Sequence, residues 1–190
     1  MALTKSPGAW TYNDLLALPD DGTRYEIIDG ELYEMPAPSW EHGIVVMNLI
    51  LLLGPLVRSL GGTIATSPVD VFFPGADPVE PDILVMLPGS RAAGGGRGVQ
   101  GPPDLLIEVL SPSTRTHDLV TKRSLYARGG VREYWIVDPQ ARTVEVLTLD
   151  GGRYRSALSV VTGEAVTSPV LGDAVFSLTE VFAGIDEETA

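Results

Sequence analysis

The sequence predicts a fold that mixes helices and strands, α/β (α+β). A mixed central β-sheet is flanked by helices, and β-hairpins are added to it. Two hairpin signals indicate antiparallel strands. In residues 24–35, apolar and polar residues alternate on both sides of Asp29-Gly30, and two further apolar stretches flank Asp150-Gly151-Gly152. A helical segment between the apolar strands 105–111 and 133–138 indicates a crossover, and therefore some parallel pairing.

Capping residues and glycines predict where the helices lie. A short helix is expected over residues 10–18 with Thr11 as its cap, and a long one over about 40–60 with Ser39 as its cap. The apolar residues of the long helix go nearly all round it, so we expect it to be well buried. Further helices are expected over 116–128, closed by Gly129-Gly130, and over 177–182.

Short apolar runs predict the remaining strands. Residues 63–73 read as a strand kinked at Pro68, and residues 82–86 as a short strand that Asp82 opens. The Gly- and Pro-rich residues 88–103 are interpreted as a surface loop inside one domain.

The length of 190 residues suits one domain. We expect an N-terminal helix and hairpin (10–35), a core (about 40–140) and a C-terminal hairpin and short helix (141–185).

The absence of cysteine excludes disulfides and thiolate metal sites and favours a cytoplasmic protein. The first residues do not have the pattern of a signal peptide. The longest apolar run, 44–53, is far shorter than the roughly 20 residues of a membrane helix, so no membrane association is expected.

The charge distribution leaves nucleic-acid binding open. The net charge of −12 argues against phosphate contacts, which need basic side chains. Residues 91–132, however, contain seven basic and three acidic residues. A basic patch on an acidic body and chance clustering on a solvated surface are both compatible with this pattern.

Two predicted strands carry an isolated carboxylate among apolar residues: Asp82 in EPDILVM and Glu108 in LLIEVLS. A lone carboxylate in a buried strand is costly unless something pairs with it. If the strands are neighbours, the two groups can lie at one end of the sheet and recruit a hard divalent cation such as Mg²⁺. Alternatively, Glu108 is edge-exposed or salt-bridged, and Asp82 is a turn residue.

Lys122 lies on the following helix, on one face with Asp118 and Tyr126. The chain has two lysines against eleven arginines, which singles out a lysine near a core face. Such a group can stabilise charge on a phosphorane-like transition state. The alternative is a surface ion pair between Asp118 and Lys122 that contributes little.

The two histidines have surface alternatives of their own. His42 could be a surface residue at a helix N-terminus, and His117 a residue that starts a helix. A zinc site is not expected, because two histidines without cysteine do not make a usual ligand set.

Together these segments resemble a known family. RYEIIDGELYEM, SWEHG, SPVDVFF, EPDILVM and the run from GPPDLLIEVLSPST to EYWIVDP are similar to the Uma-type restriction endonucleases of the PD-(D/E)XK nuclease superfamily. The resemblance spans roughly residues 10–160. It implies a restriction-endonuclease-like core, a mixed sheet between helices with an active site on two adjacent strands.

The resemblance also implies site residues. Asp82 matches the motif aspartate and Glu108 the motif acidic residue, and both would bind a divalent metal, with the carbonyl of Val109 as a further ligand. The motif lysine should stand two residues after the acid, where this chain has Leu110, so Lys122 would take its place. Glu26 is a candidate additional acid, and His42 a candidate polar group at the edge of the site.

Three functions remain as hypotheses. The first is a Mg²⁺-dependent endonuclease that acts on DNA, with Mn²⁺ able to substitute and with a homodimer expected from the symmetry of duplex cleavage. The second is a catalytically silent domain of the same fold that binds nucleic acid or a protein. The third is a metal-free enzyme with a carboxylate pair, such as a glycosidase, which EDTA would not inhibit.

Overall fold

The computed structural model describes residues 10–19, 22–35, 37–96, 98–111, 117–161 and 163–185, without the side chains of residues 117–118 and 156–159. The helices are α1 (Tyr12–Leu16), α2 (Trp40–Ser59), the π-helix η1 (His117–Lys122), α3 (Arg123–Gly129) and α4 (Leu178–Val181). The strands are β1 (Arg24–Ile28), β2 (Glu31–Met35), β3 (Thr63–Thr66), β4 (Val71–Phe72), β5 (Ile83–Met86), β6 (Ala93–Gly95), β7 (Gly98–Gln100), β8 (Leu105–Val109), β9 (Glu133–Asp138), β10 (Thr143–Asp150), β11 (Arg153–Val161), β12 (Ala165–Ser168) and β13 (Ala174–Ser177).

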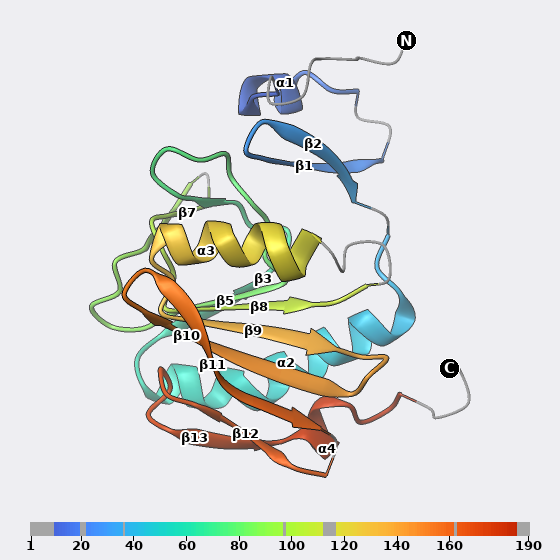
Figure 1. Cartoon of the computed structure of the whole chain (residues 1–190), viewed down its shortest axis with the longest axis vertical. Coiled ribbons are helices and arrows are strands. Elements are labelled where there is room, and N and C mark those ends of the chain that lie inside the picture. The colour runs from blue at the N-terminus through green and yellow to red at the C-terminus, as the bar shows by residue number, and fades with distance from the viewer. Residues whose placement is uncertain are drawn as a thin grey trace.

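The centre of the molecule is a six-stranded sheet in the order β11-β10-β9-β8-β5-β3. Strands β8 and β9 are parallel, as the helical crossover between them predicts, and the other neighbours are antiparallel. Helix α3 covers one face and α2 the other (Figure 1). Alternate strand residues divide between two cores: Ile83 and Ile107 pack on the α2 side, and Leu84 and Leu106 on the α3 side. The predicted mixed sheet between helices is confirmed.

Helix α2 is capped as predicted, because the Ser39 side chain accepts a hydrogen bond from the backbone N–H of His42. The expectation that it is well buried is wrong. One face is buried, while Met47 and Leu51 are 57% and 65% exposed, because the sheet covers only one side of the helix. Within the described residues, α2 is the one helix long and apolar enough to cross a membrane by length and composition alone, a test that core helices also pass.

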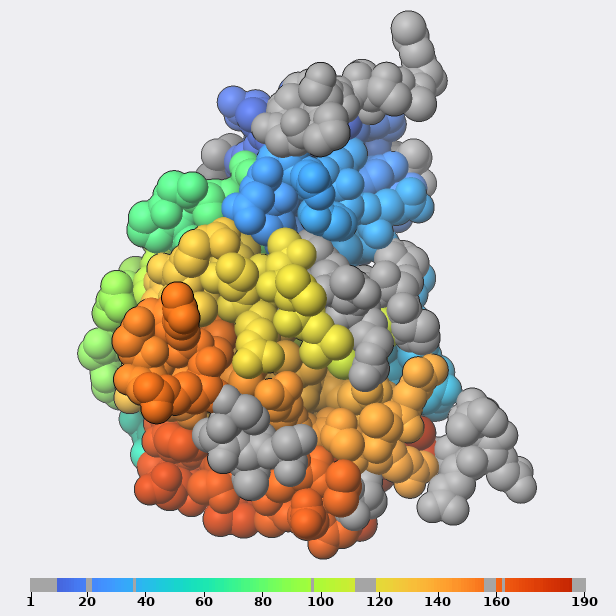
Figure 2. All heavy atoms as spheres, viewed as in Figure 1, coloured from blue at the N-terminus to red at the C-terminus, as the bar shows by residue number. Residues whose placement is uncertain are grey.

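The N-terminal helix and hairpin form as predicted. Thr11 caps α1 with a reciprocal capping box through Asp14. Asp29 and Gly30 both have positive φ angles, 52° and 78°, as a two-residue primed hairpin turn requires. The β1–β2 hairpin lies directly against α3 in the space-filling view (Figure 2). Glu26 of β1 accepts a hydrogen bond from the backbone N–H of Glu80, which precedes β5.

Two predictions for the middle of the chain are wrong. Residues 63–73 form two strands in different sheets, β3 and β4, because the chain turns at Pro68 between them. Residues 88–103 are not simply a loop, since β6 and β7 pair with β4 in a three-stranded sheet. At Gly98 the φ angle is +109°, and a Cβ atom would collide with the carbonyl oxygen of Asp70, so only glycine fits there.

Strands β12 and β13 form a hairpin that the sequence did not indicate. The fully buried Glu133 of β9 binds this hairpin to the sheet. Its carboxylate accepts hydrogen bonds from the Ser168 hydroxyl (2.6 Å), the Trp135 indole (2.7 Å) and the Val170 backbone N–H (2.9 Å). These three donors offset much of the cost of burying the carboxylate.

Candidate active site

Strands β5 and β8 bring the two predicted carboxylates together. Their antiparallel register pairs Ile83 with Ile107, so the next position along places Asp82 opposite Glu108 at the end of the sheet. The backbone N–H of Val109 donates to Asp82 Oδ2 at 2.8 Å, which joins the two strand ends directly. The prediction that neighbouring strands hold both groups at one end of one sheet is confirmed in its geometry.

Glu108 is buried, with 3% of its surface exposed, and has two close donors. The Tyr126 hydroxyl donates to Oε1 at 2.5 Å, and the Lys122 ammonium lies 3.1 Å from the same oxygen. Burial, together with the negative charge of Glu108, raises the pKa of Tyr126 well above 10, so the phenol keeps its proton and remains a donor. The alternative of an edge-exposed Glu108 is wrong, and the salt-bridged alternative is confirmed.

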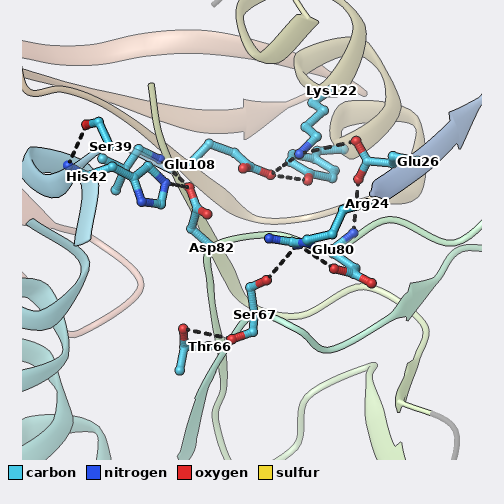
Figure 3. Close-up of polar contacts among 12 residues, drawn as sticks. Arg24, Glu26, Ser39, His42, Thr66, Ser67, Glu80, Asp82, Glu108 and Lys122 are labelled. Atoms are coloured by element: carbon cyan, nitrogen blue, oxygen red, sulfur yellow. Dashed lines mark hydrogen bonds and ion pairs between the residues drawn. The ribbon is translucent and has the colours of Figure 1, made fainter. Parts of the chain in front are cut away.

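Lys122 is itself 1% exposed and lies between two carboxylates. Its Nζ is 3.1 Å from Glu108 Oε1 and 3.5 Å from Glu26 Oε2 (Figure 3). The alternative of a surface lysine is therefore wrong. Lys122 ends η1, and Gly130 ends α3 in the left-handed conformation, as expected. Leu110 packs in the core on the α3 side, so the helix that covers this side of the sheet can supply the lysine that the strand lacks.

His42 contacts the Asp82 carboxylate from the side of the sheet that α2 covers. Its Nε2 lies 3.1 Å from Asp82 Oδ2, and its side chain is only 14% exposed. His42 lies in the first turn of α2, which Ser39 caps, and its contact with Asp82 places this turn beside the start of β5. The alternative of a surface histidine is wrong, and the predicted place at the edge of the site is confirmed.

Arg24 and Glu80 also belong to the site, and the sequence did not single them out. Arg24 Nη2 contacts Glu80 Oε2 at 2.6 Å and the Ser67 hydroxyl at 3.1 Å, while the Glu80 backbone N–H donates to Glu26 Oε1 at 3.0 Å. The sequence signal that could have found them is spacing: Glu80 stands two residues before Asp82, and Arg24 two residues before Glu26. In an extended chain, residues two apart point to the same side.

These groups surround a pocket of about 360 Å³. One part of its lining is polar and includes Asp82, Glu108, Lys122 and Arg24. The other part is apolar and comes from α2 and the segment before it. The complete lining is Arg24, Met35, Pro38, His42, Gly43, Val46, Met47, Ile50, Thr66, Ser67, Glu80, Asp82, Glu108, Val109, Ser111 and Lys122.

The donor set suits a hard divalent cation better than zinc. Within the described ranges no group of three or more His, Asp or Glu side chains converges on one point. Mg²⁺ is usually held by one or two carboxylates, with water and substrate phosphate completing its shell, so Asp82 and Glu108 fit it. Both hydrogen bonds that the described residues make to the Asp82 carboxylate go to Oδ2.

Other predictions lie partly outside the described residues. The side chains of His117 and Asp118 are among those not described, so the proposed pair of Asp118 with Lys122 is tested only from the lysine side. The Val109 backbone N–H binds Asp82, whereas the role of the Val109 carbonyl as a metal ligand stays a prediction.

Comparison with known proteins identifies the family. No curated protein matches the chain. Among solved structures, the crystal structure of a "putative nuclease belonging to DUF820" from Anabaena variabilis is similar, with a TM-score of 0.69 at 21% identity over 90% of this chain and 97% of that one. That likeness supports the fold. Residues 12–179 match the Uma2 family, described as "Putative restriction endonuclease". The chain belongs to this family, as its sequence motifs indicated.

Proposed function

We propose that the protein is a Mg²⁺-dependent endonuclease that hydrolyses phosphodiester bonds in DNA. The observation that carries the proposal is the meeting of Asp82 and Glu108 across β5 and β8, beside a buried lysine and at the wall of a pocket. Membership of a nuclease family supports this reaction class.

Asp82 and Glu108 would hold the ion, which Mn²⁺ could replace, with the Val109 carbonyl as a further ligand. When bound, the ion would neutralise phosphate charge and lower the pKa of water. The Lys122 Nζ lies 3.1 Å from Glu108 Oε1, a position from which an ammonium group would stabilise negative charge on the phosphate. His42 fixes the orientation of Asp82 through Oδ2.

The direct test is a calorimetric titration of Mn²⁺ into the wild type, Asp82→Asn and Glu108→Gln, with Asp150→Asn as a control that removes an exposed carboxylate away from the pocket. We expect one site in the wild type and the control, and none in the two site variants. Supercoiled plasmid should be nicked or linearised with Mg²⁺, and EDTA should abolish the reaction. No metal binding and no cleavage, with all variants folded, would contradict the proposal.

A silent binding domain of the same fold is the second candidate. The observation in its favour is that Glu108 already has two close side-chain partners, the Lys122 Nζ at 3.1 Å and the Tyr126 hydroxyl at 2.5 Å. DNA or protein binding that does not depend on Mn²⁺ or on Asp82 would support it. A metal-free glycosidase instead requires activity that EDTA leaves intact. The homodimer and the cytoplasmic location stay predictions.

A further inference from the structure

The pocket has an apolar wall that the proposed chemistry does not use. It consists of Met35 and Pro38, which precede α2, and of Gly43, Val46, Met47 and Ile50 on α2 itself. This wall faces the same space as Asp82, Glu108 and Lys122, since all of them line one pocket. A phosphodiester alone would give such a wall nothing apolar to contact.

Trp40 lies on α2 beside the apolar wall, although it is not itself one of the residues that line the pocket. It stands at i, i+3 and i+7 spacing with Gly43 and Met47, so the three share one side of α2. Trp40 is 75% exposed and Met47 57% exposed. Beside the apolar pocket wall, these exposed side chains extend the surface on which the apolar face of a ligand can lie.

Gly43 leaves space between these two side chains. A Cβ atom built at Gly43 would meet no atom within 4 Å, so this part of the wall is open. A glycine in a helix costs about 1 kcal/mol relative to alanine. An open glycine flanked by an exposed indole and a methionine therefore leaves room for a flat group to lie against the helix.

We infer that this wall binds an unpaired nucleobase, so that the substrate is single-stranded DNA. The inference rests on the proposed function for the identity of the substrate as DNA. Bases stack on aromatic side chains regardless of their sequence, whereas the bases of a continuous duplex are stacked on one another and cannot lie on Trp40. The polar wall then receives the phosphate attached to that base.

The test compares three fluorescent probes in Ca²⁺ and in EDTA: a 16-nucleotide oligo-dT, an abasic backbone of the same length, and a 16-base-pair duplex. The wild type should bind oligo-dT most tightly in fluorescence anisotropy. Trp40→Ala should weaken oligo-dT binding about 5- to 150-fold, the range that loss of one stacked base gives, and leave the abasic backbone unchanged. Trp40→Phe should restore most of the affinity.

Matched variants separate stacking from damage to the helix. Gly43→Met should fill the open space and weaken oligo-dT binding, while Gly43→Ala should not. Leu60→Ala removes an exposed apolar side chain at the other end of α2, about 30 Å away at 1.5 Å per residue, and should change nothing. Circular dichroism and thermal melting show whether each variant is folded.

Equal affinity for oligo-dT and the abasic backbone, or tightest binding of the duplex, would overturn the inference. It is also overturned if Trp40→Ala changes the mass in sedimentation but not the affinity, since the wall would then bind a second copy of the chain. The two proposals fail separately. Base-dependent binding without any cleavage would refute the nuclease proposal and support base binding by the apolar wall. Cleavage of duplex DNA that does not depend on Trp40 would support the nuclease proposal and refute base binding by the wall.

Discussion

Replacing Lys122 by methionine tests whether the site is held together by charge. The variant keeps a side chain of similar length and removes the ammonium that lies 3.1 Å from Glu108 and 3.5 Å from Glu26. All three side chains are at least 95% buried, so two carboxylates lose their common counter-charge in a place that water does not reach. Removing one partner of such a buried pair costs about 3–5 kcal/mol. That is a large part of the roughly 5–15 kcal/mol that stabilises a domain.

Urea unfolding at several pH values measures this loss. Buried carboxylates without the ammonium favour their protonated forms, so the folded Lys122→Met variant binds more protons than the unfolded chain. Its stability deficit should therefore be largest near pH 8 and shrink as the pH falls toward 5. Adding Glu26→Gln to the variant should recover part of the loss, because only one of the two carboxylates beside position 122 then still carries a charge.

Arg128→Met is the control for this measurement. Arg128 lies on α3, six residues along the chain, and pairs with Asp29 at 3.0 Å, but both side chains are more than half exposed. An exposed pair of this kind contributes less than about 1 kcal/mol. A loss in Lys122→Met as small as in the control, and independent of pH, would refute the view that a buried charge network holds the site.

Two further predictions concern the rest of the fold. Burial raises the pKa of Glu133 above its ordinary value of 4.5, so the folded state binds the proton more tightly and stability falls as the pH rises from about 4.5 through the raised pKa. Glu133→Gln should flatten this part of the stability–pH curve, and an unchanged slope would show that another group causes it. Gly98→Ala should lower the free energy of unfolding by about 1–3 kcal/mol, because φ is +109° and the new Cβ meets the carbonyl oxygen of Asp70. Gly95→Ala, which meets nothing within 4 Å, should stay within about 0.5 kcal/mol, and equal melting curves for the two variants would contradict the steric argument.

The central part of the site could be predicted because its signals are local. A carboxylate in an apolar strand demands a partner, and that requirement singles out Asp82 and Glu108 from the amino-acid sequence alone. Lys122 was found from its position on a helix face that adjoins the core. The strand register determines how the two carboxylates meet, since pairing of Ile83 with Ile107 places Asp82 opposite Glu108.

The remaining features depend on contacts between distant segments. Arg24 looks like an ordinary charged residue at the start of a strand, and only the docking of the hairpin brings it to Glu80, 56 residues away. The same holds for Glu133, whose partners Ser168 and Val170 come from a hairpin with strands of four residues. Such short strands carry too little alternation for a pattern to be recognised.

The position of Glu26 has a practical consequence for truncation of the protein. A fragment that started at Ser39 would keep the six central strands, both helices that cover them, and Asp82, Glu108 and Lys122. It would lose the second carboxylate beside Lys122 and the acceptor of the Glu80 backbone N–H. Inactivity of such a fragment would therefore say nothing about the proposed metal-binding pair of Asp82 and Glu108, and the shortest informative fragment begins before Arg24.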